Sequence, residues 1–423
     1  MNFHSMSVEE LRTTRSDLQK RYDELCAAGL DLNLTRGKPG PDQLDLSNEM
    51  LSLPGEDFRS PSGTDCRNYG GVTGLPELRE IFGELLGTGA DRTLALGNAS
   101  LEVMNDVTVF AMLHGTADSD RAWSAEPIKF LCPVPGYDRH FGITELYGIE
   151  MINVPMNPDG PDVEACAALV ANDPSIKGMW LVPTYSNPTG YTVSEDVARK
   201  LLAMPAADDF RIYWDNAYAV HTLVERAPEP IPVLDIAEEV GNPNRVYVFG
   251  STSKITFAGA GVAFFASSQA NLDWYIKHIS AATIGPDKLN QLRHLQFLRD
   301  ADGVRAHMDR HRALIEPKFK LVLEILEERF ADSKIASWTE PDGGYFISLD
   351  VIEGAAARTI ELAEKAGISL TAAGSAFPYK KDPHDRNIRL APTFPPIDEL
   401  RTAMDGVATC ALLGATEVLL GDE

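Results

Sequence analysis

One lysine in this sequence calls for a chemical explanation. Lys254 stands among small and apolar residues in the stretch STSKITFAGAGVAFF (251–265), just after the apolar run RVYVF (245–249). Burying a lysine without a partner is costly, so an amine at the end of a predicted strand needs a reason to be there. An amine in such surroundings binds its proton less tightly, and a neutral amine is both a nucleophile and a base.

Polar residues follow four other apolar runs in the same way. Taken singly, each has an ordinary explanation, because NPTG (187–190) is typical of a turn and Asp215 could cap a helix. The order and spacing of the whole series are harder to explain as turns and caps. The candidates are Asn98, Ala99 and Ser100 after LALG, Tyr137 after FLCPVPG, Asn187 after GMWLVPTYS, Asp215 and Tyr218 within FRIYWDNAY, and Ser251 and Ser253 ahead of Lys254.

The stretch LALGNASLEVM (94–104) predicts a strand that ends where a helix begins, at 98–100. Free backbone N–H groups and the helix dipole point at one place there, which favours an anion. Helices that begin after a glycine are common, so this feature gains weight only from its neighbours in the series.

The elements that must position these residues alternate along the middle of the chain. A helical pattern over 193–204 is one of several that separate short apolar runs. Continuous apolar strands separated by helices predict a largely parallel sheet covered on both faces, which binds ligands beyond the carboxyl ends of its strands. The apolar runs lie at 128–132, 178–182, 210–214, 245–249 and 261–266.

The two ends of the chain differ from the middle. The last hundred residues predict a smaller α+β unit, with a long helix near 306–330 and a final helix from about Ile397. The N-terminal segment predicts an amphipathic helix with a capping box formed by Ser7 and Glu10 and a stop near Gly29. We expect this segment to pack with the smaller unit.

Composition excludes several classes of function. A net charge of −24 argues against nucleic-acid binding, which needs a basic surface. Five widely spaced cysteines, no apolar run long enough for a membrane span and no signal-peptide pattern predict a cytoplasmic protein that needs neither nucleic acid nor membrane. The nine histidines show no metal-ligand spacing, so we expect no metal. His140 and His294 could approach the site, but the sequence favours core or surface roles for them.

The motifs, in their order along nearly the whole chain, resemble those of the class I (fold-type I) aminotransferases, which depend on pyridoxal 5'-phosphate. Two stretches, LTRGKPGPDQLDLS (34–47) and STSKITFAGAGVA (251–263), resemble more closely a divergent bacterial subgroup of aspartate aminotransferases. The motifs are RNYGGVTGLPELRE (67–80), GNAS (97–100), PGY (135–137), NPTG (187–190), DNAY (215–218), STSK (251–254) and NIRLAP (387–392).

The resemblance implies a fold and a domain division. The fold is α/β, with a large cofactor-binding domain over 49–305 built on a mostly parallel seven-stranded sheet between helices. A smaller α+β domain would occupy 306–423, with the segment 1–48 packed against it. The active unit would be a homodimer with shared active sites.

The resemblance also implies catalytic roles. Lys254 would form a Schiff base with the cofactor's aldehyde and then act as acid and base in the proton shift. Asp215 would keep the pyridine nitrogen protonated, which makes the ring an electron sink. Asn187 and Tyr218 would hydrogen-bond the ring's phenolate oxygen, and Tyr137 would stack on the ring.

Further residues would hold the phosphate and the substrate. Arg389 would bind the substrate α-carboxylate in a bidentate fork, and Gly37 would approach the substrate closely. Tyr69 would reach the phosphate on the neighbouring subunit. The phosphate ligands within the chain would be Asn98, Ala99, Ser100, Ser251 and Ser253.

Two departures from the family pattern matter. The family's phosphate-binding arginine, eight residues after the lysine, is replaced here by Val262. The arginine that usually binds a second carboxylate has no counterpart in HISAATIGPDK (278–288). We expect Arg36 or Lys38 to take that second role, with Arg139, Lys288 and Arg293 as the next candidates.

The leading hypothesis is therefore an aminotransferase that moves the amino group of aspartate or glutamate to 2-oxoglutarate or oxaloacetate. The same lysine and aspartate could serve a cofactor-dependent lyase or an aminotransferase for another amino acid. A ligand-sensing domain without catalysis is a remote alternative, because the N-terminal extension is too short for a DNA-binding domain and the charge has the wrong sign.

Overall fold

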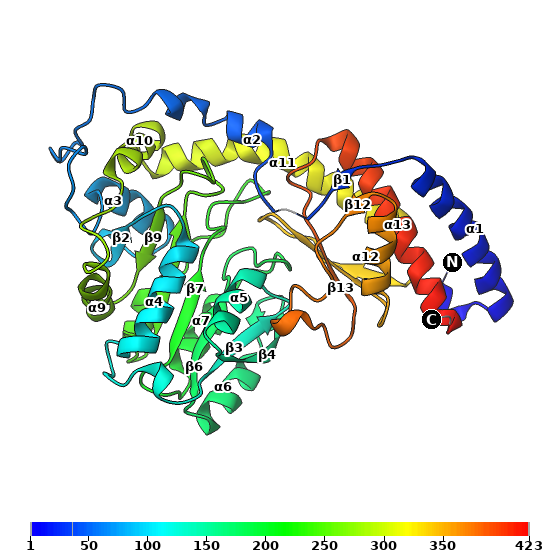
Figure 1. Cartoon of the computed structure of the whole chain (residues 1–423), viewed down its shortest axis with the longest axis horizontal. Coiled ribbons are helices and arrows are strands. Elements are labelled where there is room, and N and C mark those ends of the chain that lie inside the picture. The colour runs from blue at the N-terminus through cyan, green and yellow to red at the C-terminus, as the bar shows by residue number, and fades with distance from the viewer. Residues whose placement is uncertain (1, 36, 422–423) are drawn as a thin grey trace.

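The computed structural model describes residues 2–35 and 37–421 and shows two lobes joined along one helix (Figure 1). That helix, α11 (Ala301–Phe330), begins beside α3 (Pro76–Leu85) and α10 (Lys288–Leu298) of the large lobe and continues to α13 (Ile397–Leu420) of the small lobe. The predicted domain boundary at 305 thus falls inside a continuous helix.

The large lobe is built on a mixed sheet in the order β2-β9-β8-β7-β6-β3-β4-β5. The five strands from β8 to β4 run parallel, whereas β9 is antiparallel to both its neighbours. The predicted α/β, fold-type I class is confirmed, and the sheet has eight strands rather than seven because a two-residue strand adds to one edge. The strands are β2 (Thr93–Ala95), β3 (Lys129–Val134), β4 (Glu150–Asn157), β5 (Gly160–Pro161), β6 (Ile176–Leu181), β7 (Arg211–Asp215), β8 (Val246–Ser251) and β9 (Ala263–Ala266).

Helices cover both faces of this sheet, which explains the continuous apolar strands. On β7, Tyr213 packs into a core shared with α4 (Ser100–His114), α5 (Asp138–Leu146) and α9 (Gln269–Ile279). The alternate residues Ile212 and Trp214 pack into a second core, shared with α6 (Val163–Asn172), α7 (Glu195–Ala203) and α8 (Val233–Glu239). Strands buried on both sides leave only their ends available for chemistry.

The small lobe combines an antiparallel sheet with helices from both ends of the chain. Strand β11 (Ile347–Val351) lies between β10 (Ala336–Trp338) and β13 (Asn387–Leu390), with α12 (Ala356–Lys365) and α13 packed beside it. The N-terminal helix α1 (Val8–Ala27) packs on α13, and β1 (Leu32–Asn33) pairs with β12 (Ile368–Ser369).

The capping box predicted at the start of α1 is present. The Glu10 N–H donates to the Ser7 hydroxyl, and the Ser7 N–H donates to the Glu10 carboxylate at 2.7 Å. Gly29 follows the helix with a φ of 62°, a conformation that favours glycine. The remaining short elements are α2 (Pro41–Asp45), η1 (Phe3–Ser5), η2 (Asn48–Ser52), η3 (Ala90–Arg92), η4 (Trp123–Ala125) and η5 (Pro378–Lys380).

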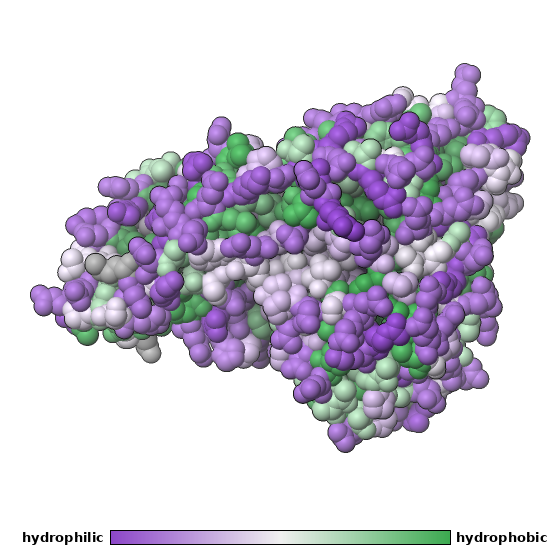
Figure 2. All heavy atoms as spheres, turned by 180° about the vertical axis from the view of Figure 1, so that it is seen from behind, coloured by the Kyte–Doolittle hydropathy of each residue, from purple (hydrophilic) through white to green (hydrophobic). Residues whose placement is uncertain are grey.

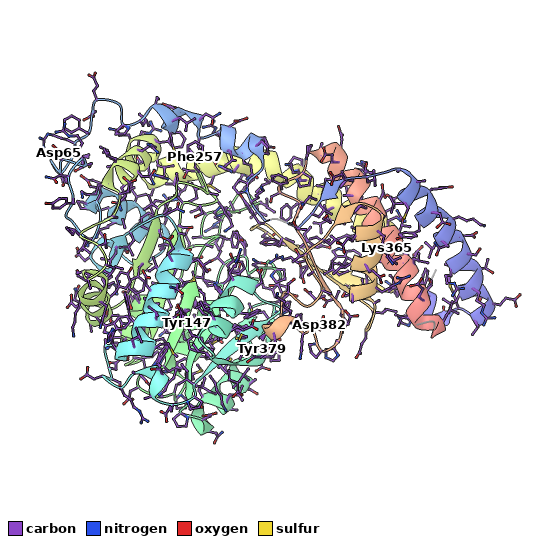
Figure 3. All side chains as sticks on the ribbon, in the orientation of Figure 1. Asp65, Tyr147, Phe257, Lys365, Tyr379 and Asp382 are labelled. Atoms are coloured by element: carbon purple, nitrogen blue, oxygen red, sulfur yellow. The ribbon has the colours of Figure 1, made fainter. Side chains whose placement is uncertain are left out.

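A segment of the small lobe also docks on the large sheet. Figure 3 shows Tyr379 and Asp382 where this segment meets the large lobe, and the Tyr379 hydroxyl accepts a hydrogen bond of 3.0 Å from the Met151 N–H at β4. The two lobes therefore meet at a second place besides α11.

Helix α13 is long and apolar enough to span a membrane by length and composition, but 72% of its apolar stretch is buried inside the structure. Its buried side faces α1, α11 and α12. The rear face of the molecule is covered mainly by hydrophilic side chains, with scattered apolar ones (Figure 2). The helix thus serves as the core helix of the small lobe.

Candidate active site

The polar residues predicted at strand ends meet at one edge of the large sheet. Strands β6, β7 and β8 are parallel neighbours, so their carboxyl ends lie side by side. Asp215 is the last residue of β7 and Ser251 is the last residue of β8, while Asn187 lies on the loop after β6.

Lys254 lies on a tight turn directly after β8. The Ile255 and Thr256 N–H groups both donate to the Thr252 carbonyl, at 2.9 and 3.0 Å, and this holds the turn. The Lys254 Nζ lies 4.9 Å from the centre of the Tyr218 ring. Burial lowers the pKa of the Lys254 amine, and the nearby Asp215 carboxylate opposes this shift.

Asp215 has one satisfied and one bare carboxylate oxygen. Its Oδ2 accepts a hydrogen bond of 2.9 Å from His140 Nε2, and the His140 ring stacks on Trp180 with centres 4.5 Å apart. The Oδ1 atom is buried and has no hydrogen-bond partner among the described residues. A bare buried acceptor costs free energy unless a donor arrives, so this atom fits the protonated pyridine nitrogen of the implied cofactor.

The sequence left His140 open between an approach to the site and a core or surface role. The first turn of α5 brings it, buried, against Asp215. Its position three residues after Tyr137, at a helix start facing the strand ends, was the available signal. His294 is buried and bonds the Thr252 and Thr256 hydroxyls, at 3.1 and 2.8 Å, so it supports the turn that carries Lys254.

Two tyrosines and an asparagine surround the same place. Tyr218 and Asn187 are each 3% exposed, and Tyr137 is half-buried. Burial raises the pKa of Tyr137 to about 12 and raises that of Tyr218 well above its usual value, so both hydroxyls keep their protons. Neutral hydroxyls can donate a hydrogen bond to an anionic oxygen.

Arg389, on β13, reaches this site from the small lobe. Its Nη1 donates to the Asp138 carboxylate at 3.2 Å and to the Asn187 amide oxygen at 3.4 Å, and its Nη2 donates to the Thr371 hydroxyl at 3.4 Å. Its Nε is buried and has no partner among the described residues. An arginine with a spare buried donor, next to one exchangeable carboxylate, is suited to bind a substrate carboxylate. Asp138 was not foreseen from the sequence.

The N-terminal loop packs against Phe346, the residue whose ring lies next to Arg389. A Cβ atom on Gly37 would stand 2.0 Å from the Phe346 ring, and the Arg389 guanidinium lies 5.0 Å from the centre of that ring. Only glycine fits such an approach. Lys38 is exposed, with its Nζ 4.4 Å from the centre of the Phe394 ring, and Arg36 lies outside the described residues.

Of the other predicted cations, two are already engaged. Lys288 Nζ donates to the Gly70 carbonyl at 2.6 Å, and Arg293 Nε donates to the Leu53 carbonyl at 3.0 Å. Arg139 is exposed, and its charge lowers the pKa of the neighbouring Tyr137 hydroxyl. Arg139 is thus the cation of these three that faces the tyrosine of the site.

The predicted phosphate ligands lie around the start of α4. The Asn98 side chain accepts from the Gly261 N–H at 2.6 Å, and a Cβ atom on Gly261 would lie 3.3 Å from the Ser253 hydroxyl. The Ser253 N–H faces the Ser251 hydroxyl at 3.4 Å, and the helix begins at Ser100 after Ala99, without a side-chain cap. Hydroxyls and free N–H groups fit an anion at this place.

Val262 adds no charge to this group, since it is 1% exposed and packs in the core around α3 and α10. Tyr69 is not brought to the site of its own chain and is 79% exposed. Its loop is nevertheless held in place, because Lys288 bonds the next residue, Gly70.

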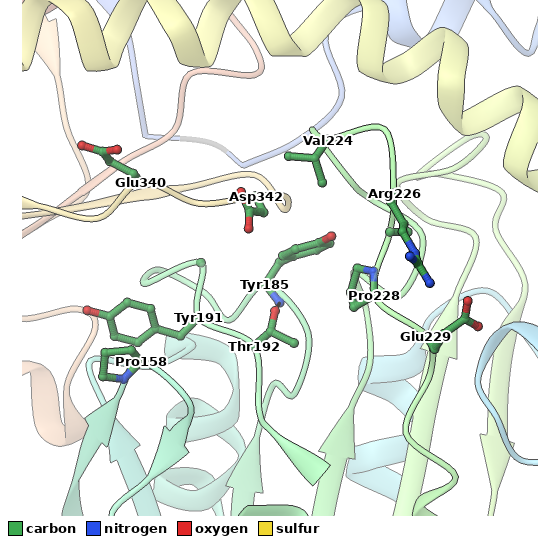
Figure 4. Close-up of a pocket in the computed structure, with 12 residues that line it drawn as sticks. Pro158, Tyr185, Tyr191, Thr192, Val224, Arg226, Pro228, Glu229, Glu340 and Asp342 are labelled. Carbon is green, nitrogen blue, oxygen red and sulfur yellow. Dashed lines mark hydrogen bonds between the residues drawn. The ribbon is translucent and has the colours of Figure 1, made fainter.

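A separate hollow of about 540 Å³ lies beside the loop that carries Asn187 (Figure 4). Tyr185 and Gly190, which flank Asn187 in the sequence, both border it. Figure 4 shows Arg226 across the hollow from Glu340. Lys254 and Asp215 do not line this hollow, so it is distinct from the site described above.

Comparisons with known proteins agree with this geometry. The model of the aspartate amino-transferase family matches residues 6–423. An aspartate aminotransferase of Corynebacterium glutamicum is 53% identical over 420 residues, which cover 99% of this chain and 97% of that protein. The crystal structure of an aspartate transaminase from the same organism has a TM-score of 0.97 at 52% identity and covers 99% of both chains.

A more distant structure shares the fold alone. The α-aminoadipate aminotransferase of Thermus thermophilus, solved with N-(5'-phosphopyridoxyl)-L-leucine, has a TM-score of 0.71 at 21% identity and covers 92% of both chains. Fold and relatives together define a fold-type I aminotransferase. The chain belongs to the aspartate aminotransferase family.

Proposed function

We propose that this aminotransferase takes the amino group of aspartate or glutamate and delivers it to 2-oxoglutarate or oxaloacetate, with pyridoxal 5'-phosphate bound covalently by Lys254. The observation that carries this proposal is the buried, bare Oδ1 of Asp215 on the same sheet edge as a lysine whose pKa is lowered. An acceptor without a donor and an amine ready to react are what this cofactor needs from a protein.

The bound cofactor supplies an electron-withdrawing ring that stabilises negative charge on the substrate's α-carbon. Lys254 Nζ would take the proton from that carbon and pass it on to the bound cofactor, because its lowered pKa makes the neutral amine more available as a base. His140 Nε2 donates to the Asp215 Oδ2 and holds this carboxylate in place. Tyr218 and Asn187 would hydrogen-bond the ring oxygen.

Substrate orientation falls to the small lobe. An incoming α-carboxylate would replace Asp138 on the Arg389 guanidinium and gain the free Nε donor. Phe346 lies beside this arginine and Gly37 lies against Phe346, so the N-terminal loop would help to cover the substrate and exclude water.

The preference for a dicarboxylic substrate is supported by the relatives named as aspartate aminotransferases. The second carboxylate needs a cation at the mouth of the site. Lys38 and Arg139 are both exposed, Lys38 on the N-terminal loop and Arg139 two residues after Tyr137. We assign the second carboxylate to one of these two, with Arg36 retained as a candidate.

The unit we propose is a homodimer in which Tyr69 reaches the phosphate held by the partner. Its support is the exposed ring of Tyr69 on a loop that Lys288 holds in place. A phosphate site without a cation at Val262 also leaves room for a contribution from a second copy. A cytoplasmic location remains a prediction.

The test is spectroscopic and kinetic. Purified protein with bound cofactor should be yellow, and its absorption band should shift when aspartate or glutamate is added and return when 2-oxoglutarate is added. A lyase would release product and keep its band without any 2-oxo acid. Dependence on a 2-oxo acid therefore separates the proposed reaction from the lyase alternative.

A further inference from the structure

Four side chains converge on two backbone carbonyls at Lys254. The Tyr345 hydroxyl lies 3.4 Å from the Lys254 carbonyl oxygen, and His221 Nε2 lies 3.3 Å from the same atom. His307 Nε2 lies 2.8 Å from the Ile255 carbonyl oxygen, with His311 directly beside it. The turn that carries the proposed catalytic amine is thus held through its backbone.

Gln43 connects two of these side chains. It is fully buried, and its Nε2 lies 2.9 Å from the Tyr345 hydroxyl and 3.1 Å from His311 Nδ1. The Gly40 N–H donates to its Oε1 at 3.1 Å. Because a backbone N–H only donates, the amide orientation is fixed, and both Nε2 hydrogens point at Tyr345 and His311. Every polar atom of the Gln43 amide is therefore used.

The direction of these hydrogen bonds follows from Gln43. His311 Nδ1 must accept, and burial lowers the pKa of His311 to about 4, so the neutral ring carries its proton on Nε2. A carbonyl cannot donate, so His307 Nε2 must also carry a proton to bond Ile255. This leaves His307 Nδ1 as a bare acceptor, and that atom indeed has no partner among the described residues. Both rings thus present an N–H at the Ile255 carbonyl.

Tyr345 completes the second branch. Its hydroxyl accepts from Gln43 and is left with its own hydrogen to donate to the Lys254 carbonyl. Burial raises the pKa of Tyr345, so the hydroxyl keeps that hydrogen. One glutamine therefore sets the donor direction toward the carbonyls of Lys254 and Ile255.

The position of Gln43 in the chain adds a second connection. It lies in α2, immediately after the N-terminal loop that contains Gly37. Gly40, whose N–H bonds Gln43, approaches the Thr393 and Phe394 carbonyls so closely that a Cβ atom would lie 3.3 and 3.2 Å from them. The same short segment thus contacts the support of Lys254 and the small-lobe segment that follows Arg389.

We propose that Gln43 is a positioning residue of the reaction, which holds the Lys254 turn through Tyr345 and His311 and keeps it in register with the loop over Arg389. This proposal rests on the proposed function of Lys254. A misplaced turn would move the amine from the carbon whose proton it transfers, and small displacements of this kind lower the rate strongly. Ground-state binding of the substrate, which depends on Arg389, would change little.

The first test measures the turn itself. Hydrogen exchange of the peptide 251–260 should be compared among the full-length wild type, Gln43→Leu and Tyr345→Phe. The matched control is Tyr22→Phe, which also removes a buried tyrosine hydroxyl from a backbone carbonyl, that of Leu362 at 3.1 Å. We expect roughly tenfold faster exchange in the first two variants and no change at this peptide in the control. Wild-type exchange in Gln43→Leu and Tyr345→Phe would overturn the proposal.

The second test measures the reaction. Both variants should lower kcat roughly tenfold with KM for aspartate within about twofold, and the double variant should lose no more than the stronger single one. The pH at which the cofactor's absorption changes should shift in both variants and stay unchanged in Tyr22→Phe. Unchanged kcat, or losses that multiply in the double variant, would overturn the proposal. Cofactor fixed at another lysine would instead overturn the proposed function, while hydrogen exchange still tests the bracing of the turn.

Discussion

The two ends of the active site are built differently. At the end that would hold the ring, Asp215, Tyr218 and Asn187 are at most 3% exposed, and His140 holds one carboxylate oxygen. At the end that would hold the phosphate, Asn98 is exposed and Tyr69 is 79% exposed. The ring end gathers buried side chains, whereas the phosphate end offers hydroxyls and N–H groups with no positive charge at position 262.

This difference indicates which end of the site controls the reaction rate and which end controls the affinity for the cofactor. Charges that tune reactivity must be buried, because a low dielectric strengthens them and fixed partners hold them. A phosphate is bound well by free N–H groups at a helix start, and a second copy of the chain can complete its site. Mutations at the ring end should therefore affect the rate, and mutations at the phosphate end should affect cofactor retention.

The largest effect is expected from Asp215→Ala. Without its carboxylate the pyridine nitrogen loses its proton, and the ring no longer stabilises the carbanion. We expect kcat to fall by several orders of magnitude while the cofactor still binds, as measured by steady-state kinetics and absorbance. A variant within tenfold of wild type would remove Asp215 from the mechanism.

His140→Phe should have the next largest effect. Phenylalanine keeps a ring against Trp180 but removes the N–H that bonds Asp215, so kcat should fall roughly 10- to 100-fold. The matched control is His278→Phe, which changes a histidine that stacks on Phe110 and His114 and lies 2.7 Å through Nδ1 from the Trp274 carbonyl. Equal activity in both variants would show that His140 only fills space.

Tyr69→Phe tests the phosphate end. Loss of one hydroxyl to the partner's phosphate should weaken cofactor binding roughly tenfold and leave kcat of the saturated enzyme nearly unchanged. Tyr379→Phe, at a 45% exposed tyrosine that bonds β4, should leave cofactor affinity as in wild type. Cofactor titration with size-exclusion measurements checks both points, and a fully active monomer would contradict the shared site.

Specificity should respond to single cations at the mouth of the site. Either Lys38→Ala or Arg139→Ala should raise KM for aspartate and glutamate roughly tenfold, with a much smaller change for alanine. If neither variant discriminates between these substrates, or both lose all of them equally, the second carboxylate binds elsewhere.

The buried histidines should also make the free energy of unfolding depend on pH. Burial lowers the pKa of His221 to about 3 and those of His294 and His311 to about 4, whereas an unfolded histidine titrates near 6.5. The unfolded chain then binds more protons, so the free energy of unfolding falls as the pH drops below about 6.5. Asp106, with a pKa raised to about 6, takes up a proton in the folded state and offsets one histidine.

We expect a net loss of roughly 4 kcal/mol between pH 7 and pH 5, measured by urea unfolding. Asp65, whose pKa is lowered to about 2 chiefly by a hydrogen bond with Arg67, loses its contribution only in more acid solution. A free energy of unfolding that stays constant or rises over this range would contradict neutral buried histidines.

Sequence predicted much of the fold because the strands are buried on both faces. Five apolar runs correspond to β3, β6, β7, β8 and β9, and the helices at both ends begin and end near the expected residues. The sequence interpretation missed β4, which is buried at only some positions, and β5, whose two residues are too few to leave a pattern. The predicted domain division remains a prediction, and α11 runs through its boundary.

The sequence predicted those site residues that stand at or just after the end of a strand, such as Asp215 and Lys254. Contacts between residues far apart in the sequence are not marked by their position after a strand. The bond between His140 and Asp215 spans 75 residues, and the bond between Gln43 and Tyr345 spans 302. Helix and loop packing brings these pairs together, and a single sequence does not reveal it.

The central claim is that Lys254 carries the cofactor, and borohydride reduction followed by peptide mass spectrometry tests it most directly. The account predicts loss of the absorption band and a reduced cofactor attached to Lys254 alone. Lys254→Ala should fold, bind no cofactor covalently and show no transamination. Attachment at any other lysine, or an active Lys254→Ala variant, would contradict the account.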